Sequence, residues 1–407
     1  MRVRTLVFNP GSNSLKFQVI EAVPDAWGRK LVVGSIDPIG KDAAFTATVP
    51  GAGRLVDEKQ PVENQGAGAA LLLSKIESGV FEKAGVRRVA DLDLLVCRVV
   101  HGASRFREPA QVDTAVLEGI EALDDLAPLH NAQSVAILRI GMQAVGHKLP
   151  LVAVFDSAFH ATLPEIAWRY AIDYSLAERH GIRRYGFHGI SHRYLMLRFA
   201  ELQGIAPQNV NIITLHLEGG SSAAAIRGGQ SVDTSMGFTP LEGLMMGTRS
   251  GDLDPALVGY LARKENVDVE TIGKWFNKES GLLGVSGSSP DTRVLVGRTD
   301  ARSRLALEMF AYRVRKYIGA YVAAMGGASA VVFGGGISEN TPDVRGRICS
   351  NLECLGLDFD PEQNRAVLDR EGCITRPGSR LQAWVIPTEE SLMMAREAAA
   401  FLNRRPK

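Results

Sequence analysis

Two similar strand–turn–strand patterns, half a chain length apart, constrain the fold of this chain more than any other feature of its sequence. In each, two apolar runs flank a turn of glycine and serine residues: runs 5–8 and 15–20 around the turn 9–14, and runs 212–217 and 223–226 around the turn 219–222. Such turns are typical of hairpins, and glycine there lets the backbone approach a ligand closely. The repetition indicates either a duplicated architecture with two facing loops or an α/β fold that contains several unrelated hairpins.

Helical patterns and one further strand lie between and after these hairpins. The expected helices cover residues 69–84, 132–144, 193–203, 304–325 and 390–403, and the expected strand covers residues 151–155. Alternating strands and helices favour the α/β class, with mixed sheets that are covered by helices. For 407 residues we expect two domains, an N-terminal lobe of residues 1–157 plus 389–407 and a C-terminal lobe of residues 158–388.

Charge, apolar patterning and cysteine usage argue against nucleic-acid binding, a membrane span, a signal peptide and disulfides. The 46 Lys+Arg residues nearly balance the 45 Asp+Glu residues, so no general electrostatic field favours nucleic acid or an anionic membrane. Residues 317–337 carry no charge, but their glycines and β-branched run favour a buried helix, a strand and a turn over a membrane span. The first apolar stretch stops at Asn9, too early for a signal peptide, and the four cysteines form no C-x-x-C pair. We therefore expect a cytoplasmic protein with reduced thiols.

Several turns rich in small residues predict a site for a polyphosphate. Neither the P-loop pattern G-x-x-x-x-G-K-[ST] nor the dinucleotide pattern G-x-G-x-x-G occurs in the sequence. Lys16 follows the first turn, and Arg249 lies between small residues in the sequence GTRSGD. Consecutive backbone N–H groups can form concavities that bind anions, and such turns are expected at 11–14, 219–222, 284–289 and 334–336.

Charged and histidine side chains at strand ends and in loops are the candidates for chemistry. Arg98 follows the apolar run 94–96, where its guanidinium could either extend to solvent or bind a carboxylate or phosphoryl group. Asp156 ends a buried strand, where ligands of α/β proteins bind, and a charge there needs a metal or a cationic partner. His188 lies in a glycine-rich loop and is a better ligand candidate than His192, which opens a helix.

Three further polar residues have a structural interpretation as well as a functional one. His216 lies within an apolar strand, where it is either a core histidine or a ligand. Asp252 and Asp254 could ligate a metal, but the proline that follows favours a helix cap. The pair of histidines four residues apart lacks the glutamate of a zinc helix, so zinc is disfavoured.

Longer motifs resemble those of one known family. They are NPGSNSLKF (9–17), RVVHG (98–102), LAPLHN (126–131), VFDSAFHATLP (154–164), RRYGFHGISHRY (183–194), DTSMGFTPLEGLMMGTRSGDLDP (233–255) and FGGGISEN (333–340). Together they resemble the acetate kinases of the acetokinase family nearly end to end. The resemblance implies the duplicated, ribonuclease H-like α/β fold shared by acetate and sugar kinases, heat-shock chaperones and actin, with an interdomain cleft. The first phosphate loop would belong to the N-terminal lobe, and the second phosphate loop and adenosine site to the C-terminal lobe.

The activity that this resemblance implies is reversible transfer of the ATP γ-phosphate to acetate, giving acetyl phosphate and ADP by direct in-line transfer. Mg²⁺ would be the metal, with Mn²⁺ as a substitute, and ATP or ADP the co-substrate. The family also implies a homodimer. In-line phosphoryl transfer depends on positioning and charge neutralisation more than on a protein nucleophile.

The resemblance assigns four sets of residues. The catalytic set is Arg98, His130, Asp156, His188 and Arg249. The set that binds the acid is Arg98, Val100, Leu129, Phe187 and Pro240. The set that binds the nucleotide and its phosphates is Ser12, Ser14, Lys16, His216, Gly219, Gly220, Asp291, Thr292, Arg293, Gly334, Gly335, Gly336 and Asn340. The metal set is Asn9 and Glu390.

The sequence departs from the family pattern in both phosphate loops. Asn13 interrupts the hydroxyl pair of the first loop, and the second loop has Glu218 and Gly219 where the family usually has glycine and asparagine. Ser338 and Ser391 replace a usual glycine and a usual glutamate. Three alternatives therefore accompany the acetate kinase hypothesis: another short acid such as propionate, another donor such as pyrophosphate, and a nucleotide-binding sensor without catalysis.

Overall fold

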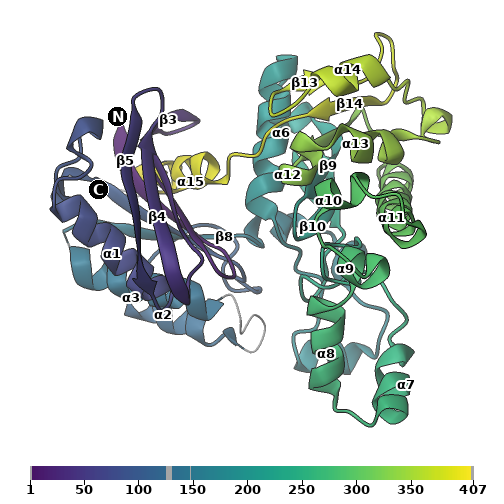
Figure 1. Cartoon of the computed structure of the whole chain (residues 1–407), viewed down its shortest axis with the longest axis horizontal. Coiled ribbons are helices and arrows are strands. Elements are labelled where there is room, and N and C mark those ends of the chain that lie inside the picture. The colour runs from purple at the N-terminus through teal and green to yellow at the C-terminus, as the bar shows by residue number, and fades with distance from the viewer. Residues whose placement is uncertain (1, 125–130, 147, 405–407) are drawn as a thin grey trace. The chain divides into compact units, whose positions relative to one another are not determined.

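The structure is a computed structural model that describes residues 2–124, 131–146 and 148–404. The chain forms two compact units. Unit 1 consists of Met1–Ala158 and Glu389–Lys407, and unit 2 consists of Phe159–Thr388. Figure 1 shows that the last helix of the chain belongs to the same unit as the first strands. Each unit has its own sheet and its own hydrophobic core.

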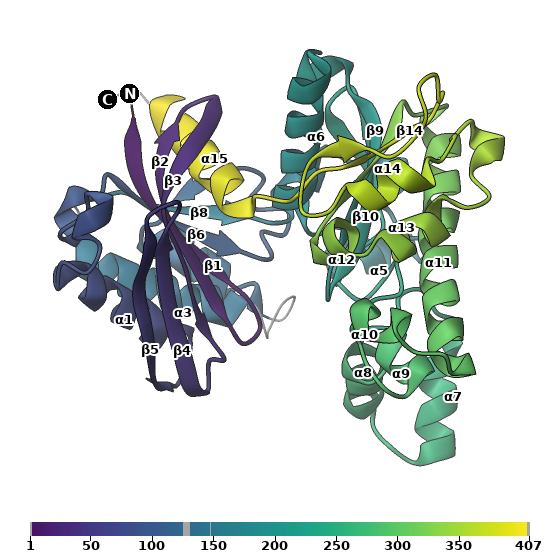
Figure 2. The same cartoon turned by 45° about the horizontal axis from the view of Figure 1, so that its top comes forward.

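Unit 1 is built on an eight-stranded sheet in the order β5-β4-β3-β2-β1-β6-β8-β7. Its strands are β1 Val3–Pro10, β2 Leu15–Val23, β3 Ala26–Asp37, β4 Lys41–Val49, β5 Gly53–Val62, β6 Leu94–Val99, β7 Ala110–Gln111 and β8 Leu151–Phe155. Its helices are α1 Gln65–Glu77, α2 Thr114–Glu121, α3 Asn131–Val145 and α15 Glu390–Arg404. Helices α1 and α3 cover one face of the sheet and α15 covers the other (Figures 1 and 2). Strand side chains alternate between these faces, and Leu6, Phe8 and Phe17 are fully buried on the α1–α3 side.

Unit 2 is built on a six-stranded sheet in the order β11-β10-β9-β12-β14-β13. Its strands are β9 Asn211–Leu217, β10 Ser221–Arg227, β11 Gln230–Thr234, β12 Ala330–Gly334, β13 Gly372–Cys373 and β14 Gln382–Val385. Its helices are α4 Glu165–Trp168, α5 Tyr174–Arg179, α6 Gly189–Gln203, α7 Ala256–Glu265, α8 Val269–Lys278, α9 Gly281–Ser286, α10 Thr292–Val296, α11 Ala301–Met325, α12 Gly336–Asn340, α13 Pro342–Cys349 and α14 Pro361–Ala366. Helices α6 and α11 cover opposite faces of this sheet (Figure 2).

The two sheets repeat one arrangement. In unit 1, β3, β2 and β1 are antiparallel neighbours, and β6 and β8 then continue parallel to β1. In unit 2, β11, β10 and β9 are antiparallel neighbours, and β12 and β14 continue parallel to β9. The duplication that the two hairpin patterns indicated is therefore confirmed, and each hairpin is the start of one copy.

Most helices and strands that the sequence predicts are present, with shifted ends. The strand expected at 151–155 is β8, and α3 extends the expected helix by one residue at each end. The prediction of a helix over 69–84 is wrong in its second half. Helix α1 ends at Glu77, and Gly79 then adopts a left-handed conformation (φ 77°).

The uncharged segment 317–337 forms the predicted helix, strand and turn. Helix α11 ends at Met325, where Gly326 caps it in a left-handed conformation (φ 72°), and the buried strand β12 follows. Among the residues that the structure describes, no helix combines the length and apolarity that crossing a membrane requires.

Candidate active site

Three of the expected site residues lie at the carboxyl ends of neighbouring strands in unit 1. Strands β1, β6 and β8 run parallel to one another. Their register places Asn9, near the end of β1, next to Arg98, near the end of β6, and Asp156 follows β8 two positions after Val154, the partner of Arg98. This edge of the sheet is where α/β proteins commonly bind ligands.

Arg98 connects these side chains to the start of the last helix. Arg98 Nη2 donates to Asp156 Oδ2 at 2.7 Å, and Arg98 Nη1 donates to Asn9 Oδ1 at 3.3 Å. Asn9 Nδ2 in turn donates to Glu390 Oε2 at 2.8 Å. The Asp156 side chain is 0% exposed and that of Arg98 15% exposed, so this ion pair is largely removed from water. We call Asn9, Arg98, Asp156 and Glu390 the Arg98 cluster.

The hairpin turn between β1 and β2 lies next to the Arg98 cluster. Gly11 N donates to Ser14 O at 2.8 Å, which closes the turn and leaves Ser12 exposed at its tip. Lys16 is exposed and pairs with Asn9 in the register of the two strands. Because paired residues of an antiparallel ladder lie on the same face, the Lys16 side chain shares a face with Asn9. The first predicted phosphate loop therefore adjoins the predicted metal residues.

In unit 2, the structure brings His188, Gly220 and Arg249 together. A side-chain carbon at Gly220 would lie 3.4 Å from His188 Cε1 and 3.5 Å from Arg249 Nη1. Arg249 is half-buried, its Nη1 donates to Pro240 O at 3.1 Å, and burial lowers its pKa. A partly desolvated guanidinium beside a glycine turn is well suited to hold a phosphoryl group.

The histidines of unit 2 have different surroundings. His188 precedes α6 in a left-handed conformation (φ 57°) and is half-buried, and its Nδ1 and Ser222 Oγ share a hydrogen bond of 2.9 Å. His192 is fully buried and is bonded through both ring nitrogens, to Thr214 Oγ1 and Ser222 Oγ, each at 2.8 Å. Burial lowers the pKa of His192 well below its ordinary value, so its ring is neutral. His188 is therefore the more accessible of the two histidines, and its role as a ligand stays a prediction.

His216 and Glu218 lie at the end of β9. The His216 and His188 ring centroids are 4.4 Å apart, and His216 Nε2 is 3.6 Å from Glu218 Oε2. Apart from Gly219 and its two chain neighbours, no heavy atom of the described residues lies within 4 Å of the position that a side-chain carbon on Gly219 would take. The second predicted phosphate loop is thus an open turn that carries a carboxylate.

The glycine turn after β12 packs against β9. Gly335 has φ 85°, and a side-chain carbon there would lie 2.7 Å from Leu217 O, so only glycine fits. Gly335 N donates to Glu339 Oε1 at 2.8 Å. The next residue, Gly336, begins α12, and Asn340 ends it with an exposed side chain that donates to Gly336 O at 3.2 Å.

The prediction of a glycine turn at 284–289 is wrong in its first half, because Gly281–Ser286 form helix α9. The Ser286 hydroxyl accepts hydrogen bonds from the backbone N–H groups of Ser288 at 3.2 Å and Ser289 at 3.3 Å. These amides therefore bond within the chain, and they do not form the expected anion-binding concavity.

The three residues expected beside adenosine lie at the start of α10. Asp291 caps the helix by accepting from Arg293 N at 2.8 Å, and it also forms an ion pair with Arg293 Nη2 at 2.7 Å. Hydrogen bonding from Arg293 lowers the pKa of Asp291. Thr292 is fully buried. The adenosine assignment of these residues stays a prediction.

The residues expected to form an acid pocket are divided between the units. Val100 is buried in unit 1, and in unit 2 Phe187 is buried while Pro240 is half-buried. Leu129, and with it the catalytic candidate His130, lies outside the described residues. The pocket therefore stays a prediction.

The N-cap residue of α7 is Pro255, and Asp254, one residue earlier, accepts from the first helical amide, Ala256 N, at 2.9 Å. Asp252 has another role, because its carboxylate accepts from Gly243 N at 2.9 Å and from the Tyr317 hydroxyl at 2.8 Å. Within the described parts of the chain, no group of three or more His, Cys, Asp or Glu side chains is arranged to hold a metal ion.

A set of side chains that the sequence did not predict holds the segment 235–255, which carries Arg249. Arg184 Nη1 donates to the carbonyl oxygens of residues 234–236 at 2.9 to 3.2 Å, and its Nη2 donates to Glu242 Oε1 at 2.6 Å. Tyr170 donates its hydroxyl to the same carboxylate. We call Tyr170, Arg184 and Glu242 the loop clamp. Adjacent arginines in the motif RRYGFHG were the available signal, but their partners are distant in sequence.

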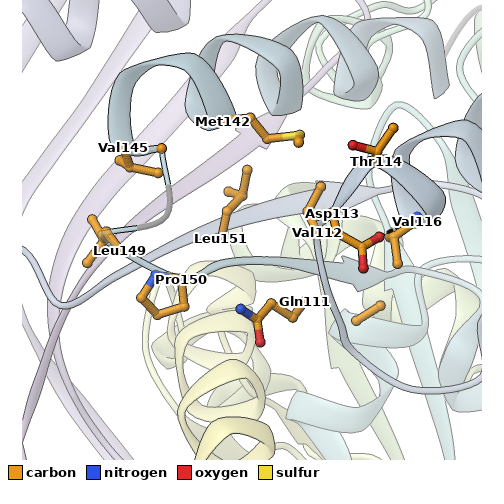
Figure 3. A pocket seen from close by; sticks show the side chains of 12 residues that line it. Gln111, Val112, Asp113, Thr114, Val116, Met142, Val145, Leu149, Pro150 and Leu151 are labelled. Atoms are coloured by element: carbon orange, nitrogen blue, oxygen red, sulfur yellow. Dashed lines mark hydrogen bonds between the residues drawn. The ribbon is translucent and has the colours of Figure 1, made fainter.

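A cavity of about 750 Å³ lies elsewhere in unit 1, between α2, α3 and the start of β8 (Figure 3). Its walls are both apolar and polar, and they include Val112, Met142 and Leu151 as well as Gln111 and Asp113. It adjoins the amino end of β8, whereas Asp156 follows the carboxyl end, so the cavity and the Arg98 cluster are separate features.

Comparison with known proteins gives consistent matches over the whole chain. The family model for the acetokinase family matches residues 4–396. An acetate kinase of Solibacter usitatus is 46% identical over 412 residues, which cover 99% of each chain. An acetate kinase of Thermotoga maritima is 42% identical, again with 99% of each chain covered.

Solved structures of similar proteins agree with these matches. The crystal structure of Porphyromonas gingivalis acetate kinase has a TM-score of 0.89 and 36% sequence identity, and the match covers 98% of this chain and 100% of that one. The crystal structure of a propionate kinase from Francisella tularensis has a TM-score of 0.86 and 35% identity, with 97% and 98% covered. The fold expected from the sequence motifs is therefore confirmed.

Proposed function

Since the chain belongs to the acetokinase family, we propose that it catalyses the reversible transfer of the γ-phosphate of ATP to acetate, giving acetyl phosphate and ADP. It is a kinase whose acceptor is a carboxyl group. The observation that carries the proposal is the Arg98 cluster, in which an arginine is fixed by a buried carboxylate and an amide at the carboxyl edge of the sheet.

Each of the two arginines has a proposed role in the transfer. Asp156 and Asn9 fix the orientation of the Arg98 guanidinium, so that it can hold the carboxylate of the acid before the reaction. Arg249 and His188 lie beside Gly220 and bind the phosphoryl group whose charge develops during transfer. Removing one such donor typically lowers the rate by about 10²–10³.

We propose that Asn9 and Glu390 hold Mg²⁺ together with the donor phosphates, with Mn²⁺ as a substitute. Their side chains are 2.8 Å apart, and they supply an amide and a carboxylate. Mg²⁺ in phosphoryl-transfer sites is usually bound by one or two carboxylates, substrate phosphates and water, so the lack of a larger ligand cluster among the described residues fits this mode. The ion would neutralise charge on the transferring phosphates.

The activity is tested with the purified full chain, ATP, Mg²⁺ and acetate, by trapping acetyl phosphate as its hydroxamate. Propionate replaces acetate in a second series, and pyrophosphate replaces ATP in a third. We expect turnover with acetate and ATP, and a loss of at least about a hundred-fold in the Arg98→Ala variant. No acyl phosphate from any combination, with MgATP bound, would instead identify a nucleotide-binding protein without catalysis.

We further propose that the protein is a cytoplasmic homodimer. All four cysteines are free, as is usual in a reducing compartment. Unit 2 exposes apolar side chains on three of its helices, Leu257 and Tyr260 on α7, Val269 on α8, and Leu305 and Tyr312 on α11. Light scattering of the wild type and of Tyr312→Glu tests the dimer: a monomeric wild type would contradict the proposal.

A further inference from the structure

Glu218 places a carboxylate between two glycine turns of unit 2. Strands β9 and β12 are parallel neighbours, so the turns that follow them lie at the same edge of the sheet. Glu218 Oε1 is 3.9 Å from the position that a side-chain carbon on Gly336 would take, and Glu218 Oε2 is 3.6 Å from His216 Nε2. The Glu218 side chain is 52% exposed, so it can interact with an entering ligand.

At the second turn the Glu339 carboxylate already accepts from Gly335 N, but on the Gly220 side the surroundings of Glu218 favour an anion. Gly220 lies two residues further in the same turn, next to Arg249 and His188. The turn is open at Gly219. A phosphate chain that binds along these turns would meet positive charge on one side and the negative charge of Glu218 on the other. Like charges a few ångströms apart at a protein surface repel appreciably, and the repulsion falls when a cation neutralises one of them.

We propose that Glu218 selects the phosphoryl donor by charge, so that the chain binds nucleotide as its complex with a divalent cation and rejects the uncomplexed phosphate chain, free pyrophosphate included. This inference rests on the proposed function, in which the donor phosphates bind at these turns. Mg²⁺ neutralises two of the charges on a nucleoside diphosphate, which removes most of the repulsion. The same carboxylate attracts the hydrated cation.

Calorimetric titration of ADP tests the proposal, once with excess Mg²⁺ and once with EDTA, and a third titration uses pyrophosphate with EDTA. Glu218→Gln removes the charge and keeps the size of the side chain, and Glu218→Ala provides a second variant if the first does not fold. Glu270→Gln, at an exposed position in the first turn of α8, is the matched control for the change in net charge.

We expect Glu218→Gln to strengthen the binding of Mg²⁺-free ADP and of free pyrophosphate about ten-fold and to change MgADP binding less than about three-fold. Glu270→Gln should bind all three ligands as the wild type does. Equal changes for complexed and free ADP, or no change, would overturn the role of Glu218. A wild type that binds no MgADP and makes no acetyl phosphate would overturn the proposed function instead, whatever the variants do.

Discussion

Replacing Arg98 by alanine should destabilise unit 1 in addition to removing activity. The Asp156 carboxylate is fully buried and lies 2.7 Å from the Arg98 guanidinium. Removing one partner of a buried ion pair leaves an uncompensated charge and costs about 3–5 kcal/mol of unfolding free energy. We therefore expect Arg98→Ala to lose an amount in this range, a large part of the stability of an ordinary domain.

The pair between Arg293 and Asp291 is a matched control, because it has the same N–O distance of 2.7 Å but its arginine side chain is 72% exposed. Solvent screens such a pair, so Arg293→Ala should cost less than about 1 kcal/mol. The comparison separates burial from distance as the cause of the larger effect.

A double-mutant cycle identifies the buried charge as the origin of the cost. Asp156→Asn removes the charge that Arg98→Ala leaves behind, so the double variant should lose less than the sum of the single losses, with a coupling of about 1–3 kcal/mol. The assay is native-state hydrogen exchange of the β6 and β8 amides, which reports on unit 1 alone. If Arg98→Ala costs no more than Arg293→Ala, or if the cycle is additive, burial of the Asp156 charge is not the cause of the loss.

Three further predictions concern unit 2. Arg249→Ala should lower kcat about 10²–10³-fold while thermal melting changes little, because Arg249 lies beside the phosphate turn, and an unchanged kcat in the folded variant would remove its role. Arg184→Lys keeps the positive charge of the loop clamp but loses the planar guanidinium that bonds several partners at once. We expect kcat to fall more than KM rises, with an unaltered circular dichroism spectrum. A kcat equal to that of the wild type would show that the clamp does not position Arg249. Burial lowers the pKa of His192 below its ordinary value of 6.5. As the pH falls below 6.5, the imidazole therefore takes up a proton in the unfolded chain but not in the folded one. The unfolding free energy should then drop by about 1.4 kcal/mol per pH unit. Urea unfolding of His192→Gln should show a shallower pH dependence, and an identical slope would contradict this origin.

The sequence predicted the parts of the fold that depend on local pattern. The two hairpins and strand β8 were recognisable because their apolar runs are buried and bounded by glycine, serine or a charged residue. Strands β4 and β5 extend the unit 1 sheet but were missed because neither has a continuous apolar run: buried and half-buried side chains alternate in β4, and most side chains of β5 are exposed. Helix α9 was mistaken for a turn because its glycine content outweighed the signal for a short buried helix.

The same division holds for the candidate site. Sequence motifs alone singled out Arg98, Asp156 and Arg249, because unusual charges next to apolar runs and glycines are visible in a chain. Three relations come from the folded chain alone: Asp156 is fully buried against Arg98, Arg184 and Glu242 hold the segment that carries Arg249, and Glu218 faces a second glycine turn. These relations join residues that are far apart along the chain, and they arise from strand register and packing, which no local pattern contains.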